Sequence, residues 1–140
     1  MQLEMWQDQP ELDEYRNGAL IWAPLGFDVV DDTDLPECDR RWYDEPRTTD
    51  CVLTIGVKRD PLLRERDGTD ALANRAERYI AIDSELTGAY ELTLAVAHEL
   101  GHIVLDTDRH TQGGLMGGAS AKIEQADYEL ACDVVGLCVR

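Results

Sequence analysis

The chain has 140 residues, of which 29 are acidic and 13 are lysine or arginine, giving a net charge of −16. This length fits a single domain over residues 1–140 with one hydrophobic core. The negative charge repels phosphate backbones and anionic lipids, and no apolar run is long enough to span a membrane. We therefore exclude nucleic acid and membranes as partners, and we expect a monomer.

Three elements are predicted in the N-terminal part. Residues 2–6 alternate polar and apolar side chains, which predicts a first strand. Residues 10–22 carry apolar side chains at three- and four-residue spacing after acids in the first turn, which predicts a helix that Gly18 weakens. The apolar run within residues 25–32 predicts a short strand, and an acidic loop follows through Pro46.

The middle of the chain predicts two further strands. Residues 51–57, CVLTIGV, are β-branched and nearly continuous in apolar character, which favours a central strand covered on both faces. Residues 58–78 have no clear period and predict an exposed loop, with a helical turn at 71–76. Residues 78–83, RYIAID, alternate and predict an edge strand just before the next helix.

Four cysteines make an even number in a small acidic chain. Pairing of neighbours would join Cys38 to Cys51 and Cys132 to Cys138, although three connectivities exist and reduced thiols in a cytoplasmic protein are the alternative. Two disulfides would indicate a secreted or extracytoplasmic protein. The N-terminus lacks the basic-then-apolar pattern of a signal peptide, so an export signal or a pro-segment would lie upstream.

Residues 93–118 hold all three histidines of the chain. The segment HELGH lies in a helical pattern over residues 89–105, so His98 and His102, four residues apart, share one helix face and can bind one Zn²⁺. Glu99 is placed to take a proton from a metal-bound water. A chance pattern on an amphipathic helix is the alternative. The predicted apolar stripe of this helix consists of Leu92, Val96, Leu100 and Ile103.

A catalytic zinc takes three protein ligands and keeps one position open, so a third ligand must come from elsewhere. The candidates are His110, Asp108, Glu124 and Glu129. Downstream of the histidines, pairs of glycines flank Leu115 and Met116, which predicts a tight reversal around a buried methionine. Residues 121–137 predict a final helix. Its apolar face would consist of Ile123, Ala126, Leu130, Val134 and Leu137.

The order of these elements, and specifically residues 97–118, resembles the metzincin metalloproteases, above all matrixin-like and snapalysin-like catalytic domains. Their pattern HExxHxxGxxH, with Asp as the last ligand in snapalysins, precedes a turn whose Met lies beneath the zinc. The resemblance implies an α+β fold of three layers: a small twisted mixed sheet, active-site and backing helices, and a C-terminal helix. It implies ligands at His98, His102 and Asp108, a general base at Glu99 and the Met-turn residue at Met116.

The chain departs from the family pattern at two positions. Leu105 stands where the family has a glycine that turns the chain out of the helix, and a side chain resists positive φ. We therefore expect the helix to end differently, in a loop that can bring His110 to the metal in place of Asp108. Imidazole is the better zinc donor, which favours His110, and the other residue would then lie beside the site.

Together these features predict a zinc-dependent endopeptidase in which Glu99 activates a metal-bound water and then protonates the leaving amine. A protein or peptide substrate would lie extended along the edge strand at residues 78–83. One alternative is an ImmA-like gluzincin peptidase, in which Glu129 is the third ligand and Asp133 follows it four residues later. The other is a metal- or protein-binding module without catalysis.

Overall fold

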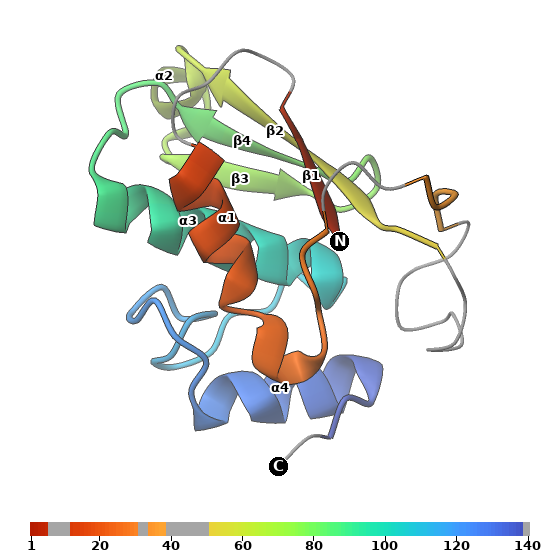
Figure 1. The fold of residues 1–140 in the computed structure, drawn as a ribbon. Helices are drawn as coiled ribbons and strands as arrows, with labels where there is room; N and C mark the ends of the chain where they lie inside the picture. Colours follow the sequence, from red (N-terminus) through yellow and green to blue (C-terminus); the bar gives the residue numbers. More distant parts are fainter. Residues whose placement is uncertain (6–11, 31–33, 39–50, 139–140) are drawn as a thin grey trace.

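The computed structural model describes residues 1–5, 12–30, 34–38 and 51–138. Four strands form one mixed sheet in the order β1-β2-β4-β3 (Figure 1). Strands β1, β2 and β4 are parallel, while β3 runs antiparallel to β4 at one edge. The strands are β1 Gln2–Met5, β2 Thr54–Asp60, β3 Ala71–Asn74 and β4 Tyr79–Asp83. The predicted α+β class with a small mixed sheet is confirmed.

Helices α1, α3 and α4 form two further layers on one side of the sheet. Figure 1 shows α1 and α3 beneath the strands and α4 beneath α3. A short helix α2 joins β2 to β3, and a 3₁₀ turn η1 follows α1. The helices are α1 Leu12–Leu20, η1 Ala23–Leu25, α2 Leu63–Asp67, α3 Ala89–Val104 and α4 Gln125–Val135.

Helix α3 is the central element of the hydrophobic core. Its predicted apolar stripe is buried, and it packs with the inward side chains of β2 and β4 in one cluster. Helix α1 crosses α3 at Gly18, where an added Cβ would lie 2.9 Å from the carbonyl oxygen of Thr93. Gly18 therefore permits close helix packing, which offsets its low helix propensity. The indole nitrogen of Trp22 donates a hydrogen bond of 2.8 Å to the carbonyl of Ala97.

Two sequence predictions are wrong in the described residues. The apolar run at 27–30 is not assigned to a strand: Phe27 is fully buried, Val30 donates to the carbonyl of Met1, and the N-terminal ammonium of Met1 donates to the carbonyl of Asp28. Burial of Phe27 accounts for its apolar character. The predicted loop at 58–78 contains the end of β2, helix α2 and strand β3. Of the helical turn expected at 71–76, residues 71–74 form the strand and residues 75 and 76 begin the turn after it.

Strand β4 is also not the edge strand that its position in the sequence predicted. It lies between β2 and β3, and all its residues except Tyr79 are buried. Strand β2 begins three residues later than predicted but lies inside the sheet, as expected for a covered strand. Parts of three predictions lie outside the described residues. These are residue 6 of the first strand, residues 10 and 11 of the first helix, and most of the acidic loop up to Pro46.

Two disulfides form in the predicted pairing. Cys38 is joined to Cys51, and Cys132 is joined to Cys138 just beyond the end of α4. Such bonds persist in oxidising compartments, so the chain has the chemistry of a protein outside the reducing cytosol. In the part of the chain that the structure describes, no helix combines the length and apolar character needed to cross a membrane.

Candidate metal centre

The last two turns of α3 carry a pair of oriented histidines. The rings of His98 and His102 lie with centroids 4.9 Å apart and planes at 87°. The Nδ1 atom of His98 lies 2.9 Å from the carbonyl oxygen of Leu115, and that of His102 lies 2.8 Å from the carbonyl oxygen of Thr107. A carbonyl can only accept, so each Nδ1 carries the proton and each Nε2 keeps a lone pair for a metal.

The loop after α3 brings a third imidazole to this pair. The ring of His110 stacks on His98 with centroids 5.2 Å apart and meets the ring of His102 edge to face at 4.9 Å. Each of the three rings offers one nitrogen that could bind a metal, and these three nitrogens all lie within 4.8 Å of one another. Tetrahedral zinc needs nitrogens about 3.3 Å apart, which small side-chain rotations would provide. This group could hold a metal ion, and three imidazoles suit zinc and other transition metals.

The end of α3 explains how the chain reaches His110. Leu105 caps the helix in a right-handed conformation, with φ −91° and ψ −9°, and the left-handed residue is Asp106, with φ 49°. The residue with positive φ is therefore Asp106, one residue after Leu105, where the metzincin pattern has its glycine. Aspartate tolerates positive φ better than leucine, because its short side chain bonds locally. The hydroxyl of Thr107 then accepts a hydrogen bond from the backbone amide of Arg109, which fixes the loop just before His110.

The other candidate ligands lie outside this histidine group. Asp108 is exposed and lines a cavity beside His102 and His110, but it is not a member of the group. On α4, Glu129 accepts a bond from the side-chain amide of Gln125, and Asp133 pairs with Arg109. Glu124 is the N-cap residue of α4. The arrangement that would place Glu129 at the metal is therefore not the one the structure shows.

Glu99 borders a cavity of about 300 Å³ that opens beside the histidines. Burial raises the pKa of the Glu99 carboxyl to about 7, and burial lowers the pKa of His98 and His102. The positive charge of Arg75 contributes further to the low pKa of His102. On its opposite side the cavity is walled by β3 and the segment before it. Its lining residues are Thr69, Ala71, Leu72, Ala73, Arg75, Glu99, His102, Thr107, Asp108 and His110.

Comparison with protein family models, with curated proteins and with solved structures finds no match. The family resemblance drawn from HELGH and its downstream turn therefore has no support from overall similarity. What the chain can do must be inferred from the side chains around the three histidines.

Sequence reasoning missed one residue that positions this centre. Asp127 of α4 is fully buried, and its carboxylate accepts bonds of 2.8 Å from the amides of both Leu115 and Met116. It also accepts a bond of 2.9 Å from the amide of Glu124, completing a capping box. The Glu-x-x-Asp spacing before an apolar helix was the available signal, since capping boxes have this period.

The predicted reversal around a buried methionine is confirmed, and it lies directly under the histidine helix. Residues 115–118 form a turn in which Leu115 and Met116 are fully buried. The Met116 thioether packs against the backbone of Gly101, where an added Cβ would overlap its sulfur atom. The carbonyl of Leu115 also accepts the hydrogen bond from Nδ1 of His98, so the carboxylate of Asp127 is linked to a candidate metal ligand through one short turn.

Proposed function

We propose that the chain is a zinc-dependent endopeptidase of the metzincin type. The observation that carries this proposal is the convergence of three imidazoles, two from the HELGH helix and one from the following loop, with Glu99 beside them on the cavity wall. Three neutral imidazoles with one open position form the ligand set of a catalytic rather than a structural zinc site. The buried Met-turn beneath the helix adds support from the same region.

Each residue then has a chemical role. His98, His102 and His110 would hold the metal through the nitrogens that are left without a proton. Bound zinc would act as a Lewis acid and would lower the pKa of a coordinated water toward neutrality. Glu99, whose pKa burial raises to about 7, would accept a proton at neutral pH and pass it to the leaving amine. Asp108 would remain at the rim of the cavity without binding the metal.

In the described part of the chain β3 is the outermost strand of the sheet, and this edge supports an extended peptide as the substrate. The backbone amide of Asp83 donates to the carbonyl of Asp70, which makes these two residues a hydrogen-bonded pair of the antiparallel ladder. Such pairs alternate along the ladder, so Leu72 and Asn74 also bond to β4. Ala71 and Ala73 lie between those pairs, and their backbone groups therefore point away from β4, at the cavity that Glu99 borders. The carbonyl of Ala71 also accepts a bond of 3.0 Å from the Thr69 hydroxyl and keeps a second lone pair for a peptide amide. A peptide can add to such an edge as a further strand. We place the substrate on β3 in place of the 78–83 segment predicted from sequence.

The proposed setting is outside the cytoplasm. Two disulfides support export, because they persist where thiols are not kept reduced.

The test is hydrolysis of an unfolded protein by the purified chain and by Glu99→Ala. We expect the variant to retain the metal and to lose most activity, at least about 100-fold, because general acid–base catalysis contributes that much. Glu91→Ala is the matched control, since Glu91 is an exposed glutamate in the first turn of the same helix. Equal cleavage by the Glu99→Ala variant and the parent protein would refute the proposed function.

A further inference from the structure

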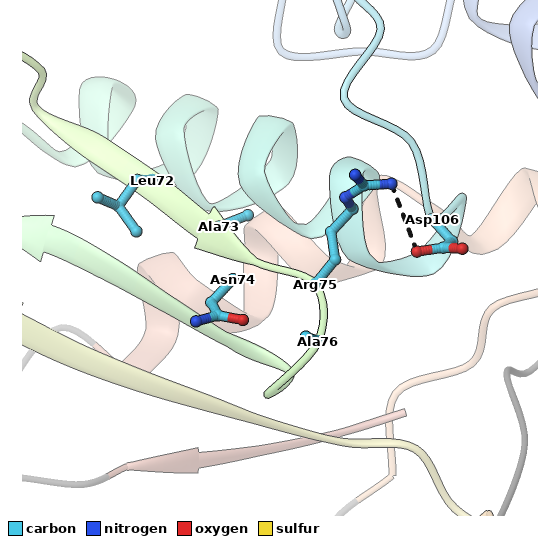
Figure 2. Close-up of a pocket in the computed structure, with 6 residues that line it drawn as sticks. All are labelled: Leu72, Ala73, Asn74, Arg75, Ala76 and Asp106. Atoms are coloured by element: carbon cyan, nitrogen blue, oxygen red, sulfur yellow. Dashed lines mark ion pairs between the residues drawn. The ribbon is translucent and has the colours of Figure 1, made fainter.

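A second cavity continues the groove beyond the candidate active site. It has a volume of about 440 Å³ and shares Leu72, Ala73 and Arg75 with the cavity that Glu99 borders. The two cavities therefore follow the same stretch of β3, from the histidines to the turn that leads into β4. Figure 2 shows Arg75 extending from the end of β3 toward Asp106, at the end of α3. Arg75 lies where the two cavities meet.

The guanidinium of Arg75 is loosely paired. Its Nη1 lies 3.5 Å from Oδ1 of Asp106, and the arginine side chain is 38% exposed. Charge-assisted hydrogen bonds are about 2.7–2.9 Å long, so this contact is weaker than a direct one. Other arginines pair more closely: Arg64 at 2.6 Å and Arg78 at 3.2 Å from their carboxylates. Because a guanidinium has five N–H donors in a planar fork, Arg75 can take a second carboxylate without losing the first.

We infer that Arg75 binds a carboxylate of the peptide substrate and thereby makes cleavage selective for an acidic residue at one position. This inference rests on the proposed function, because it needs a peptide lying along Ala71 and Ala73 of β3. Such a peptide passes Arg75 as it leaves the histidines and enters the second cavity.

The surrounding charge makes this selectivity local. The chain carries a net charge of −16, and the groove is also lined by Glu99, Asp106 and Asp108. A substrate carboxylate would be repelled where it passes these acids and attracted beside Arg75, because exposed charges interact strongly only within about 10 Å at ordinary salt. A zinc ion on the histidines would attract a carboxylate as well, so the preference due to Arg75 should appear at a separate subsite and depend on that arginine.

The test uses binding, so that it does not depend on turnover. Decapeptides of Ala, Gly, Ser and Leu, acetylated and amidated at their ends, carry a single Glu or Gln at each position in turn. Their dissociation constants are measured with zinc-loaded Glu99→Ala protein, which cannot consume them. At one position we expect Glu to bind about fivefold more tightly than Gln, as a partly exposed ion pair provides. Peptides with a free C-terminal carboxylate and no Glu test whether the main-chain carboxylate is bound instead.

Substitutions of arginine then assign the effect. In the Glu99→Ala background, Arg75→Met should abolish the Glu preference and Arg75→Lys should keep part of it. Arg66→Met should leave it intact, because Arg66 is also an exposed arginine, 57% against 38% for Arg75, and lines neither cavity. Equal binding of every Glu and Gln pair, or a set of Glu preferences that Arg75→Met leaves unchanged at every position, would overturn the inference. A preference that depends on Arg75, in a protein that cleaves nothing, would uphold the Arg75 site and refute the peptidase. Cleavage without an Arg75-dependent preference would uphold the peptidase and refute the Arg75 site.

Discussion

Asp127→Asn is the substitution whose effect the structure determines most fully. The carboxylate is fully buried and accepts three backbone bonds, from Leu115, Met116 and Glu124, at 2.8 to 2.9 Å. Asparagine has nearly the same shape but only one acceptor oxygen. Its NH₂ group would face at least one of these amides, so two donors would meet with no acceptor between them.

The expected loss of stability follows from these bonds. One buried amide without an acceptor costs about 1–3 kcal/mol, and two remaining bonds to a neutral oxygen in place of a charged one lose about 1 kcal/mol each. We therefore expect Asp127→Asn to lower the free energy of unfolding by about 4 kcal/mol. In the turn that Asp127 holds, the carbonyl of Leu115 accepts the hydrogen bond from Nδ1 of His98, so metal affinity should also fall, by about 10- to 100-fold.

Urea unfolding followed by circular dichroism measures the first effect, and competition with a fluorescent chelator measures the second. Glu129→Gln is the matched control, because it makes the same change at an exposed position of the same helix. It should alter the free energy of unfolding by less than about 0.5 kcal/mol. A loss below about 1 kcal/mol for Asp127→Asn would show that this carboxylate does not hold the turn.

Three further predictions concern the same region. Without metal, the raised pKa of Glu99 stabilises the fold below pH 4.5, and this contribution is lost as the pH rises through about 7. Glu99→Gln should therefore become more stable than the parent by roughly 3 kcal/mol over that range, as pH-dependent urea titrations would show, and parallel curves would contradict this. Gly101→Ala should destabilise the protein by at least about 2 kcal/mol in the same assay, because an added Cβ would overlap the sulfur of Met116, whereas a neutral effect would show that this packing relaxes easily. Alkylation of unreduced protein should label no cysteine, and the peptide containing Cys132 should be joined to that containing Cys138; labelling of either would contradict the pairing.

The sequence predicted the elements that have strong periodicity. The apolar stripe of α3 repeats at helical spacing, and the burial of the core follows it. The histidine pair could be placed for the same reason, because a spacing of four residues on a long helix fixes both side chains on one face. The cysteine pairing was also predicted, since neighbours in sequence close the shortest loops.

Tertiary pairing explains what sequence reasoning missed. Strand β3 has only four residues and no alternation in burial, so its assignment depends on the partner β4, reached through a tight turn at Arg78, where φ is 56°. Phe27 looks like a strand residue because it is apolar, yet it is buried by side-chain packing without a ladder. Whether His110 or Asp108 approaches the other histidines depends on which residue after α3 takes positive φ, and the sequence did not identify Asp106 as that residue.

Zinc retention by two histidine variants and by Asp108→Asn tests the central claim most directly. Protein purified without added metal should hold about one zinc per chain by elemental analysis. After dialysis against a weak chelator, His98→Ala and His110→Ala should lose that zinc, because each leaves only two protein donors. Asp108→Asn should retain it, since Asp108 lies outside the histidine group. An empty site in Asp108→Asn together with a full one in His110→Ala would contradict the account.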